Sequence, residues 1–313
     1  MMWKSDGKEL TIDVRQISVI IPTLNRRHTL PRAIESVLRQ TLVPNEIIVV
    51  DNGSRDGTIE MVESRYPSVR ILHEESVGVS AARNCGIRIA NGIWLALLDS
   101  DDEWSPNKLQ KQMETYNKVG SSTRLIHTNE IWKRNGSLVS QMKKHKKSGG
   151  SIFNACLPRC CISPSSSLLR RDLFDDLGYF DTNLPACEDY DLWLRICARE
   201  QVCFVDEDLI IKHGGHEDQL SQKHWAMDRF RVYALEKLIR SEEISQENRT
   251  SAIEMLIQKI LVLISGGLKR KNVDLVSFYS KKKAFWVDMC AGDQNTKVQQ
   301  IQDIEKELDY YRE

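Results

Sequence analysis

The sequence predicts an α/β fold, in which a doubly wound, mostly parallel sheet is followed by an α-helical extension. Between residues 17 and 98, short apolar segments alternate with amphipathic helical segments. Such alternation indicates parallel strands with helices packed on the sheet. Two of the apolar segments end in a carboxylate, at Asp51 and Asp99. Beyond residue 220 the pattern changes to long amphipathic helices.

Local composition places the elements of the first part. β-Branched and other apolar residues cluster in segments that we predict as strands, at residues 17–22, 46–51, 69–72 and 94–98. Helices are predicted between them, at residues 29–40, 59–66 and 78–90. The first helix carries Pro31 near its start, where proline is tolerated.

The second part is less regular. Helices are predicted at residues 107–119, 171–177 and 186–199, and strands at residues 124–132, 165–170 and 202–205. Asn135-Gly136 is a strong turn signal and predicts a hairpin. Residues 143–164 are basic and loop-rich.

Three regions follow from this pattern. Residues 1–16 form a lead-in, residues 17–220 an α/β domain, and residues 221–313 a helical extension. Amphipathic helices are predicted within the extension, at residues 223–240, 246–265 and 295–311.

Charge and cysteine content restrict the partners and the compartment. Lys plus Arg equals Asp plus Glu, at 44 each, so the net charge gives no reason to expect a nucleic acid partner. The basic runs are interpreted as solvated surface, at residues 143–147, 269–271 and 281–283. Eight cysteines without a CxxC pair indicate a reduced, cytoplasmic protein.

No signal peptide and no membrane-spanning helix are predicted. The first residues lack an apolar core, and the apolar stretch at residues 255–268 is too short and contains Lys259. We therefore expect a cytoplasmic protein, with peripheral contact to the inner face of the membrane as a further hypothesis. The apolar stripes of the C-terminal helices also fit a homodimer.

The segment that ends in Asp99-Ser100-Asp101 is the strongest functional signal. Residues two apart in an extended chain point the same way, about 7 Å from each other. The end of such a strand faces the crevice where open parallel sheets bind ligands. Two unpaired carboxylates there repel each other and attract a divalent cation. The alternative is a solvated acidic loop.

Five sequence blocks resemble family 2 glycosyltransferases, which have the GT-A fold and use nucleotide-activated sugars. The blocks are Val19 to Asn25, Val49 to Thr58, Ala82 to Gly86, Leu98 to Asp102 and Glu188 to Trp193. The resemblance covers residues 17 to about 220 and implies an inverting transfer from a nucleoside-diphosphate sugar. UDP is the expected nucleotide, and a glycan or lipid-linked hydroxyl is the expected acceptor.

The resemblance also implies roles for particular residues. Donor-nucleotide contacts are expected from Pro22, Thr23, Asn25, Asp51, Arg83, Asn84 and Asp99. A Mn²⁺ or Mg²⁺ ion is expected on Asp101 with Asp99, and His216 is the candidate for a further ligand. Asp189 is the expected general base, with Glu188 and Asp191 as the other catalytic candidates.

Structural explanations compete with each of these roles. Asp51 also suits a helix cap or an acid in a loop, Arg83 a surface cation, and His216 a surface turn. The three acids from Glu188 to Asp191 also suit the first turn of a helix, where negative charge is favourable.

Two other functions are compatible with parts of the sequence. HAD-type phosphohydrolases carry a DxDx(T/V) pattern, usually on the first strand, but here the fifth position is Glu103 and the pattern lies on the fourth strand. A non-catalytic homologue that only binds a nucleotide sugar is the second alternative. The intact Asp99, Asp101 and Asp189 argue against it.

Overall fold

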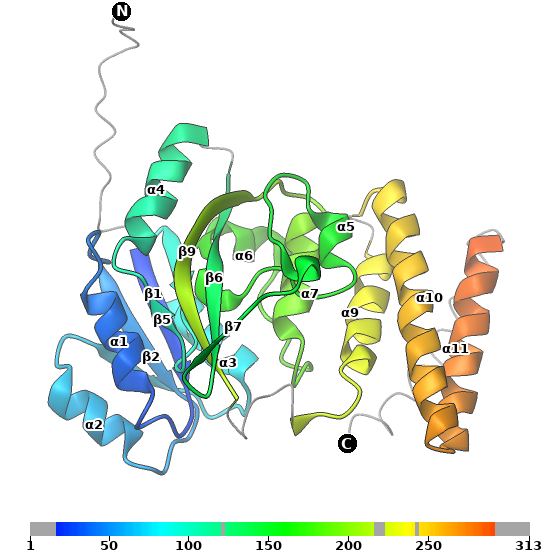
Figure 1. Ribbon diagram of the computed structural model, residues 1–313, viewed down its shortest axis with the longest axis horizontal. Helices are drawn as coiled ribbons and strands as arrows, with labels where there is room; N and C mark the ends of the chain where they lie inside the picture. Colours follow the sequence, from blue (N-terminus) through cyan, green and yellow to red (C-terminus); the bar gives the residue numbers. More distant parts are fainter. Residues whose placement is uncertain (1–16, 120–122, 216–222, 242–243, 292–313) are drawn as a thin grey trace, which may run out of the picture. The chain divides into compact units, whose positions relative to one another are not determined.

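The computed structural model describes residues 17–119, 123–215, 223–241 and 244–291. The chain divides into two compact units at residue 222. The first unit contains a nine-stranded sheet in the order β3-β2-β1-β4-β8-β6-β9-β5, with β7 paired to β6 (Figure 1). The α/β class predicted from the sequence is confirmed.

The first half of the sheet is parallel, as the alternating pattern predicted. β1 pairs with β2 and β4, and β2 pairs with β3. The strands are β1 (Ile17–Thr23), β2 (Glu46–Asp51), β3 (Arg70–His73) and β4 (Trp94–Leu97). The intervening helices are α1 (Leu30–Leu38), α2 (Thr58–Arg65) and α3 (Val79–Ile89).

Helices cover both faces of this half. Alternate residues of β1, such as Val19 and Ile21, share one hydrophobic cluster with residues of α1, α2 and α4 (Lys108–Val119). Ile20 points to the opposite face, where Gly86 of α3 approaches so closely that an added Cβ would lie 2.5 Å from its side chain. The two-sided burial explains why β1, β2 and β4 are nearly continuous apolar runs.

The second half of the sheet is mixed. β8 (Leu168–Arg170) is antiparallel to both β4 and β6, whereas β6 and β9 are parallel. The other strands are β5 (Glu103–Trp104), β6 (Leu125–Arg134), β7 (Ser137–Val139) and β9 (Cys203–Gly214). The short helices of this half are α5 (Phe153–Cys156), α6 (Asp172–Leu177) and α7 (Glu188–Cys197). Asn135 and Gly136 have φ values of 49° and 80°, so the predicted hairpin turn between β6 and β7 is confirmed.

β9 continues well beyond the predicted end at residue 205. Val205 pairs with Thr128, but the next residue of β6, Asn129, pairs with Asp208. The intervening Asp206 and Glu207 are exposed at this irregularity, and their charges interrupt the apolar pattern on which the prediction depended. The continuation carries Lys212 and His213 along β6.

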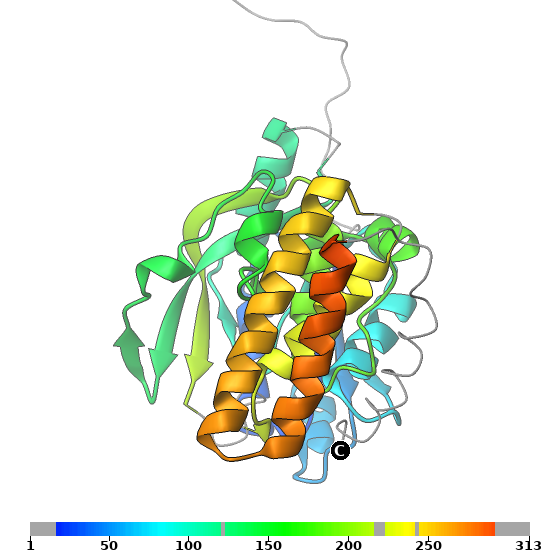
Figure 2. The ribbon, with the colours of Figure 1, turned by 90° about the vertical axis from the view of Figure 1, so that its right-hand side faces the viewer.

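The second unit consists of helices. Its described helices are α9 (Asp228–Arg240), α10 (Gln246–Lys269) and α11 (Val273–Ala291), and Figure 2 shows α10 and α11 side by side. The predicted helix at residues 295–311 lies outside the described residues. By length and composition alone, α10 could cross a membrane, yet its Leu256, Ile260 and Leu263 are buried along one face.

The sequence pattern did not predict α11, because the buried residues of this helix lie in a segment that contains the basic run at residues 281–283. Lys282 is only 1% exposed, and its ammonium lies 2.7 Å from both carboxylate oxygens of Glu236 on α9. The indole of Trp286 donates to the same carboxylate. The interpretation of residues 281–283 as solvated surface is therefore wrong for Lys282.

Candidate active site

The ends of β1 and β2 bring the predicted nucleotide residues together. Pro22 and Thr23 are the register partners of Val50 and Asp51. The Asp51 carboxylate accepts a hydrogen bond from the backbone of Ser54 at 3.2 Å, so it supports its own loop, as the structural alternative held. The Thr23 hydroxyl is buried, and among the described residues it has no hydrogen-bond partner. Such an unsatisfied buried hydroxyl is costly without a ligand.

Asn25 couples the loops that follow these two strands. Its backbone is in the left-handed region, with φ at 53°. Its backbone N–H donates to the Ser54 hydroxyl at 2.8 Å, and its side-chain oxygen accepts from the backbone of Arg55 at 2.8 Å. The amide oxygen of Asn25 is thus used within the protein.

Arg83 is the centre of the site. It is 3% exposed, which excludes the alternative of a surface cation. One guanidinium nitrogen donates to Asp99 at 2.7 Å and the other to Glu188 at 2.6 Å. Burial alone would lower the pKa of Arg83, but the two carboxylates outweigh it and raise that pKa above its ordinary value. Arg83 therefore links the end of β4 to the start of α7.

Asn84 has a different environment from its neighbour. Its side-chain amide donates to the Phe180 carbonyl at 2.8 Å and accepts from the Phe180 backbone N–H at 3.0 Å. Asn84 is 2% exposed. These contacts favour a role in fixing the chain before α7, while direct contact with a nucleotide stays a prediction.

The acids after β4 differ in their surroundings. Asp102 is buried and accepts from the Ser165 hydroxyl at 2.6 Å and from the backbone N–H of His213 at 3.2 Å. Burial raises the pKa of Asp102 well above its ordinary value, and Asp101 and Asp99 add to the rise. Asp102 therefore connects this loop to β9 rather than facing a ligand.

Asp99 and Asp101 fit a divalent cation. Burial and the charge of Asp99 raise the pKa of Asp101, as expected for neighbouring carboxylates without a cation between them. No group of three or more metal-ligating side chains occurs within the described part of the chain, and His216 lies outside it. Mg²⁺ and Mn²⁺ accept phosphate and water oxygens as their remaining ligands. Two carboxylates and a bound diphosphate would therefore complete such a site.

The first turn of α7 presents Glu188 and Asp189. Burial and the charge of Asp189 raise the pKa of Glu188 to about 7, and the Arg83 guanidinium opposes this rise. Asp189 is half-buried, and its Oδ2 accepts a hydrogen bond from the Cys160 thiol at 3.1 Å. Cys160 was not among the predicted site residues, because it lies in the loop-rich segment 143–164.

Asp191 is occupied by an ion pair within its own helix. It is 2% exposed, and Arg195 donates to its Oδ2 at 2.8 and 3.0 Å. Arg195 also binds the backbone carbonyls of Leu177, Gly178 and Tyr179. These contacts favour the alternative in which Asp191 supports the helix.

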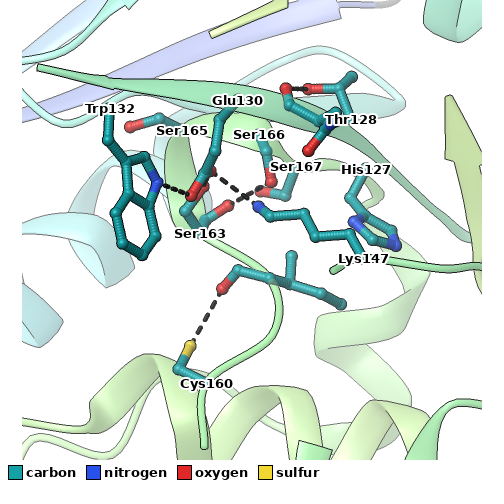
Figure 3. Close-up of polar contacts among 12 residues, drawn as sticks. His127, Thr128, Glu130, Trp132, Lys147, Cys160, Ser163, Ser165, Ser166 and Ser167 are labelled. Atoms are coloured by element: carbon teal, nitrogen blue, oxygen red, sulfur yellow. Dashed lines mark hydrogen bonds and ion pairs between the residues drawn. The ribbon is translucent and has the colours of Figure 1, made fainter. Parts of the chain in front are cut away.

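A buried network fixes the loop that carries Cys160. Figure 3 shows Lys147, Ser163 and Trp132 converging on the Glu130 carboxylate of β6. Lys147 lies 2.7 Å from Glu130 and is 8% exposed, so the interpretation of residues 143–147 as solvated surface is wrong for Lys147. Burial would raise the pKa of Glu130, but the charges of Lys147 and Lys212 lower it to about 2. Glu130 thus stays ionised.

Because of His127, the protein should lose stability at acidic pH. Burial and the charge of Lys147 lower its pKa to about 3, against an ordinary value of 6.5. Below pH 6.5 the unfolded chain takes up a proton that the folded protein does not, so stability falls as the pH drops towards 3. We expect His127→Gln to remove a slope of up to about 1.4 kcal/mol per pH unit. Denaturant unfolding at pH 7, 6, 5 and 4 measures it, and parallel curves for the two proteins would contradict it.

Comparison with known proteins gives a consistent result. Residues 18–178 match the family described as Glycosyl transferase family 2. An uncharacterized glycosyltransferase of Rickettsia felis is 34% identical over 71% of this chain and 38% of its own length. The chain thus spans little more than a third of that relative. The UDP-Glc:alpha-D-GlcNAc-diphosphoundecaprenol beta-1,3-glucosyltransferase WfgD of Escherichia coli is 28% identical over 82% of this chain and 96% of that protein.

Solved structures share the fold. S. aureus TarS 1-349 in complex with UDP-GlcNAc has a TM-score of 0.62 and 18% identity, covering 85% of this chain and 90% of its own. The mannosyltransferase PcManGT from Pyrobaculum calidifontis, in complex with GDP-Man and Mn²⁺, has a TM-score of 0.56 and 15% identity, covering 87% and 84%. The expected GT-A fold is confirmed by these likenesses.

Proposed function

Because the chain belongs to glycosyl transferase family 2, we propose that it transfers a sugar, with inversion, from a nucleoside-diphosphate sugar to a hydroxyl group. A glycan or lipid-linked molecule is the proposed acceptor and UDP the proposed nucleotide. The UDP-Glc specificity in the name of WfgD and the UDP-GlcNAc bound in the TarS complex support the choice of UDP.

The observation that carries this proposal is the double ion pair of Arg83. One guanidinium binds both Asp99 and Glu188. Asp99 belongs to the proposed diphosphate and metal site, and Glu188 is the neighbour of the proposed base, Asp189. Inverting transfer needs a base on the face of the sugar opposite the leaving group. A rigid connection between the two carboxylate groups fixes this separation and lowers the cost of orienting the substrates.

The residues then divide the reaction between them. Thr23 and Asp51, which are paired at the ends of β1 and β2, would bind the nucleoside. The Thr23 hydroxyl, which has no partner among the described residues, supports this assignment. Asp189 accepts the proton of the acceptor hydroxyl. At the same time the oxygen of that hydroxyl bonds to the anomeric carbon, and the bond from the anomeric carbon to the diphosphate breaks. Asp101 and Asp99 would hold Mn²⁺ or Mg²⁺, which would stabilise the charge that develops on the diphosphate. The Mn²⁺ in the PcManGT complex supports this assignment.

A thermal-shift screen tests the donor assignment. UDP-, GDP- and dTDP-sugars are added with and without Mn²⁺, and the correct donor should raise the melting temperature by mass action. We expect the largest shift from a UDP-sugar with Mn²⁺. A protein that no nucleotide sugar stabilises would contradict the proposed function.

Cys160 is predicted to act through the base. Burial and the charge of Asp189 raise the pKa of its thiol well above the ordinary value, so the thiol remains protonated and donates a hydrogen bond. Cys160→Ala should lower kcat about fivefold, since a typical hydrogen bond contributes about 1 kcal/mol. The KM for the donor should not change.

Two variants control this experiment. Cys160→Ser keeps a donor and should recover most of the activity, whereas Cys203→Ala, at a thiol next to Thr123, should leave kcat unchanged. A kcat for Cys160→Ala equal to that of wild type would show that the thiol does not act on the base.

A further inference from the structure

Lys212 is placed among the acids of the site by β9. Its register partner on the parallel strand β6 is Trp132, and paired residues of neighbouring strands project to the same face of a sheet. Trp132 bonds to the Glu130 carboxylate on that face. On the other side of β9, the backbone N–H of the next residue, His213, binds Asp102. Lys212 therefore projects between the Glu130 network and the loop after β4.

The charges of four carboxylates act on the Lys212 ammonium. Burial would lower the pKa of Lys212, but the charges of these acids raise it above the ordinary value. These acids are Glu130, Asp102, Asp99 and Asp189. They come from both ends of the proposed reaction centre, the diphosphate end with Asp99 and the base with Asp189.

The ammonium nevertheless makes no direct contact with any of them. Within the described part of the chain, the Lys212 ammonium donates no hydrogen bond, and no carboxylate oxygen lies within 4.0 Å of it. Lys147 behaves differently, since it lies 2.7 Å from Glu130. Arg83 is likewise bound to Asp99 and Glu188. The positive charge of Lys212 is thus influenced by these acids without being bound to one of them.

We infer that Lys212 is a further catalytic residue, whose ammonium binds the diphosphate of the donor and neutralises it as it leaves. This inference rests on the proposed function. A diphosphate entering this site meets the charges of Asp99, Asp101 and Asp189, which repel it. A cation held by Asp99 and Asp101 would offset part of this repulsion, and the Lys212 ammonium, with three donors, offsets more from the side of β9.

Nucleotide affinities test the inference without a turnover assay. UDP and UMP, and in parallel GDP and GMP, are titrated into wild type and Lys212→Met by calorimetry, with Mn²⁺ present. Charge-assisted hydrogen bonds contribute enough for a 10- to 100-fold effect. We expect Lys212→Met to weaken the binding of the diphosphate nucleotide by about that factor, and the binding of the monophosphate nucleotide by less than about threefold. Lys212→Arg, which keeps the charge, should recover most of the affinity.

Lys133→Met is the matched control. Lys133 is the neighbour of Trp132 on β6, so its side chain projects to the opposite face of the sheet, and its removal should leave both affinities unchanged. If Lys212→Met binds the diphosphate as tightly as wild type, or loses both nucleotides equally, the inference is overturned. The inference would also be overturned if Lys212→Met had a lower melting temperature but an unchanged ratio of diphosphate to monophosphate affinity. Lys212 would then only neutralise the charge of the acids. A wild-type protein that binds no nucleoside diphosphate would instead contradict the proposed function.

Discussion

Asp189→Asn should lower the transfer rate by about 10²- to 10⁴-fold, the usual contribution of a positioned general base. Asn has the same shape as Asp but cannot accept a proton. The carboxylate is half-buried at the first turn of α7, with its Oδ2 on the Cys160 thiol. Binding of the donor should persist, because the residues proposed to bind the nucleotide lie at the ends of β1 and β2. Initial rates and calorimetric titration of the same preparations measure both quantities.

Asp175→Asn provides the control for this experiment. Asp175 is an exposed acid on α6, and its replacement changes the net charge by the same amount without touching α7. Wild-type kcat is expected. If Asp189→Asn retained more than about a tenth of the activity, another group would have to be the base, and Glu188 would be the nearest candidate.

In the parallel half of the fold, β1, β2 and β4 were predictable because they are buried on both faces. Such strands are apolar along their whole length, so the signal needs no knowledge of distant contacts. The turn at Asn135-Gly136 was equally local, since both residues adopt positive φ values. The beginnings and ends of these elements differ from the prediction by only a few residues.

The missed features depend on charges that find partners far along the chain. Lys282 is buried only because Glu236, 46 residues away, neutralises it. Lys147 is buried because Glu130 does the same on β6. In the sequence, both lysines belong to basic runs that have the composition of a solvated surface. A buried ion pair is therefore invisible until the fold brings its two members together.

The site was predictable in its acids but not in its connections. Asp51, Asp99 and Asp101 follow apolar strands, and strand ends face the ligand crevice in this class of sheet. The link from Arg83 to Glu188 joins residues 105 positions apart, and no spacing rule reveals it. Lys212 was equally hidden, because the prediction ended β9 before it.

Asp101→Asn should have opposite effects on activity and on stability. Loss of one metal ligand should lower the transfer rate at saturating donor by about 10²- to 10³-fold, the equivalent of the several kcal/mol that a Lewis acid supplies. In the absence of metal, the free energy of unfolding of Asp101→Asn should instead be higher than that of wild type. Burial and the charge of Asp99 raise the pKa of Asp101, so the ionised side chain is unfavourable in the folded protein and its neutral isostere is not. Functional acids held close together commonly show this trade-off.

Chelation separates the metal from the carboxylates. Treatment of wild type with EDTA should reduce the rate as far as Asp101→Asn does, and Mn²⁺ should restore wild type but not the variant. In thermal denaturation with EDTA present, Asp101→Asn should melt above wild type, and Mn²⁺ with a UDP-sugar should reverse that order because only wild type binds the metal. Asp206→Asn, at an exposed acid of β9, controls for the change in net charge. Full activity in EDTA would exclude a metal role for Asp99 and Asp101, and would leave Arg83 and Lys212 as the cations on which the leaving diphosphate depends.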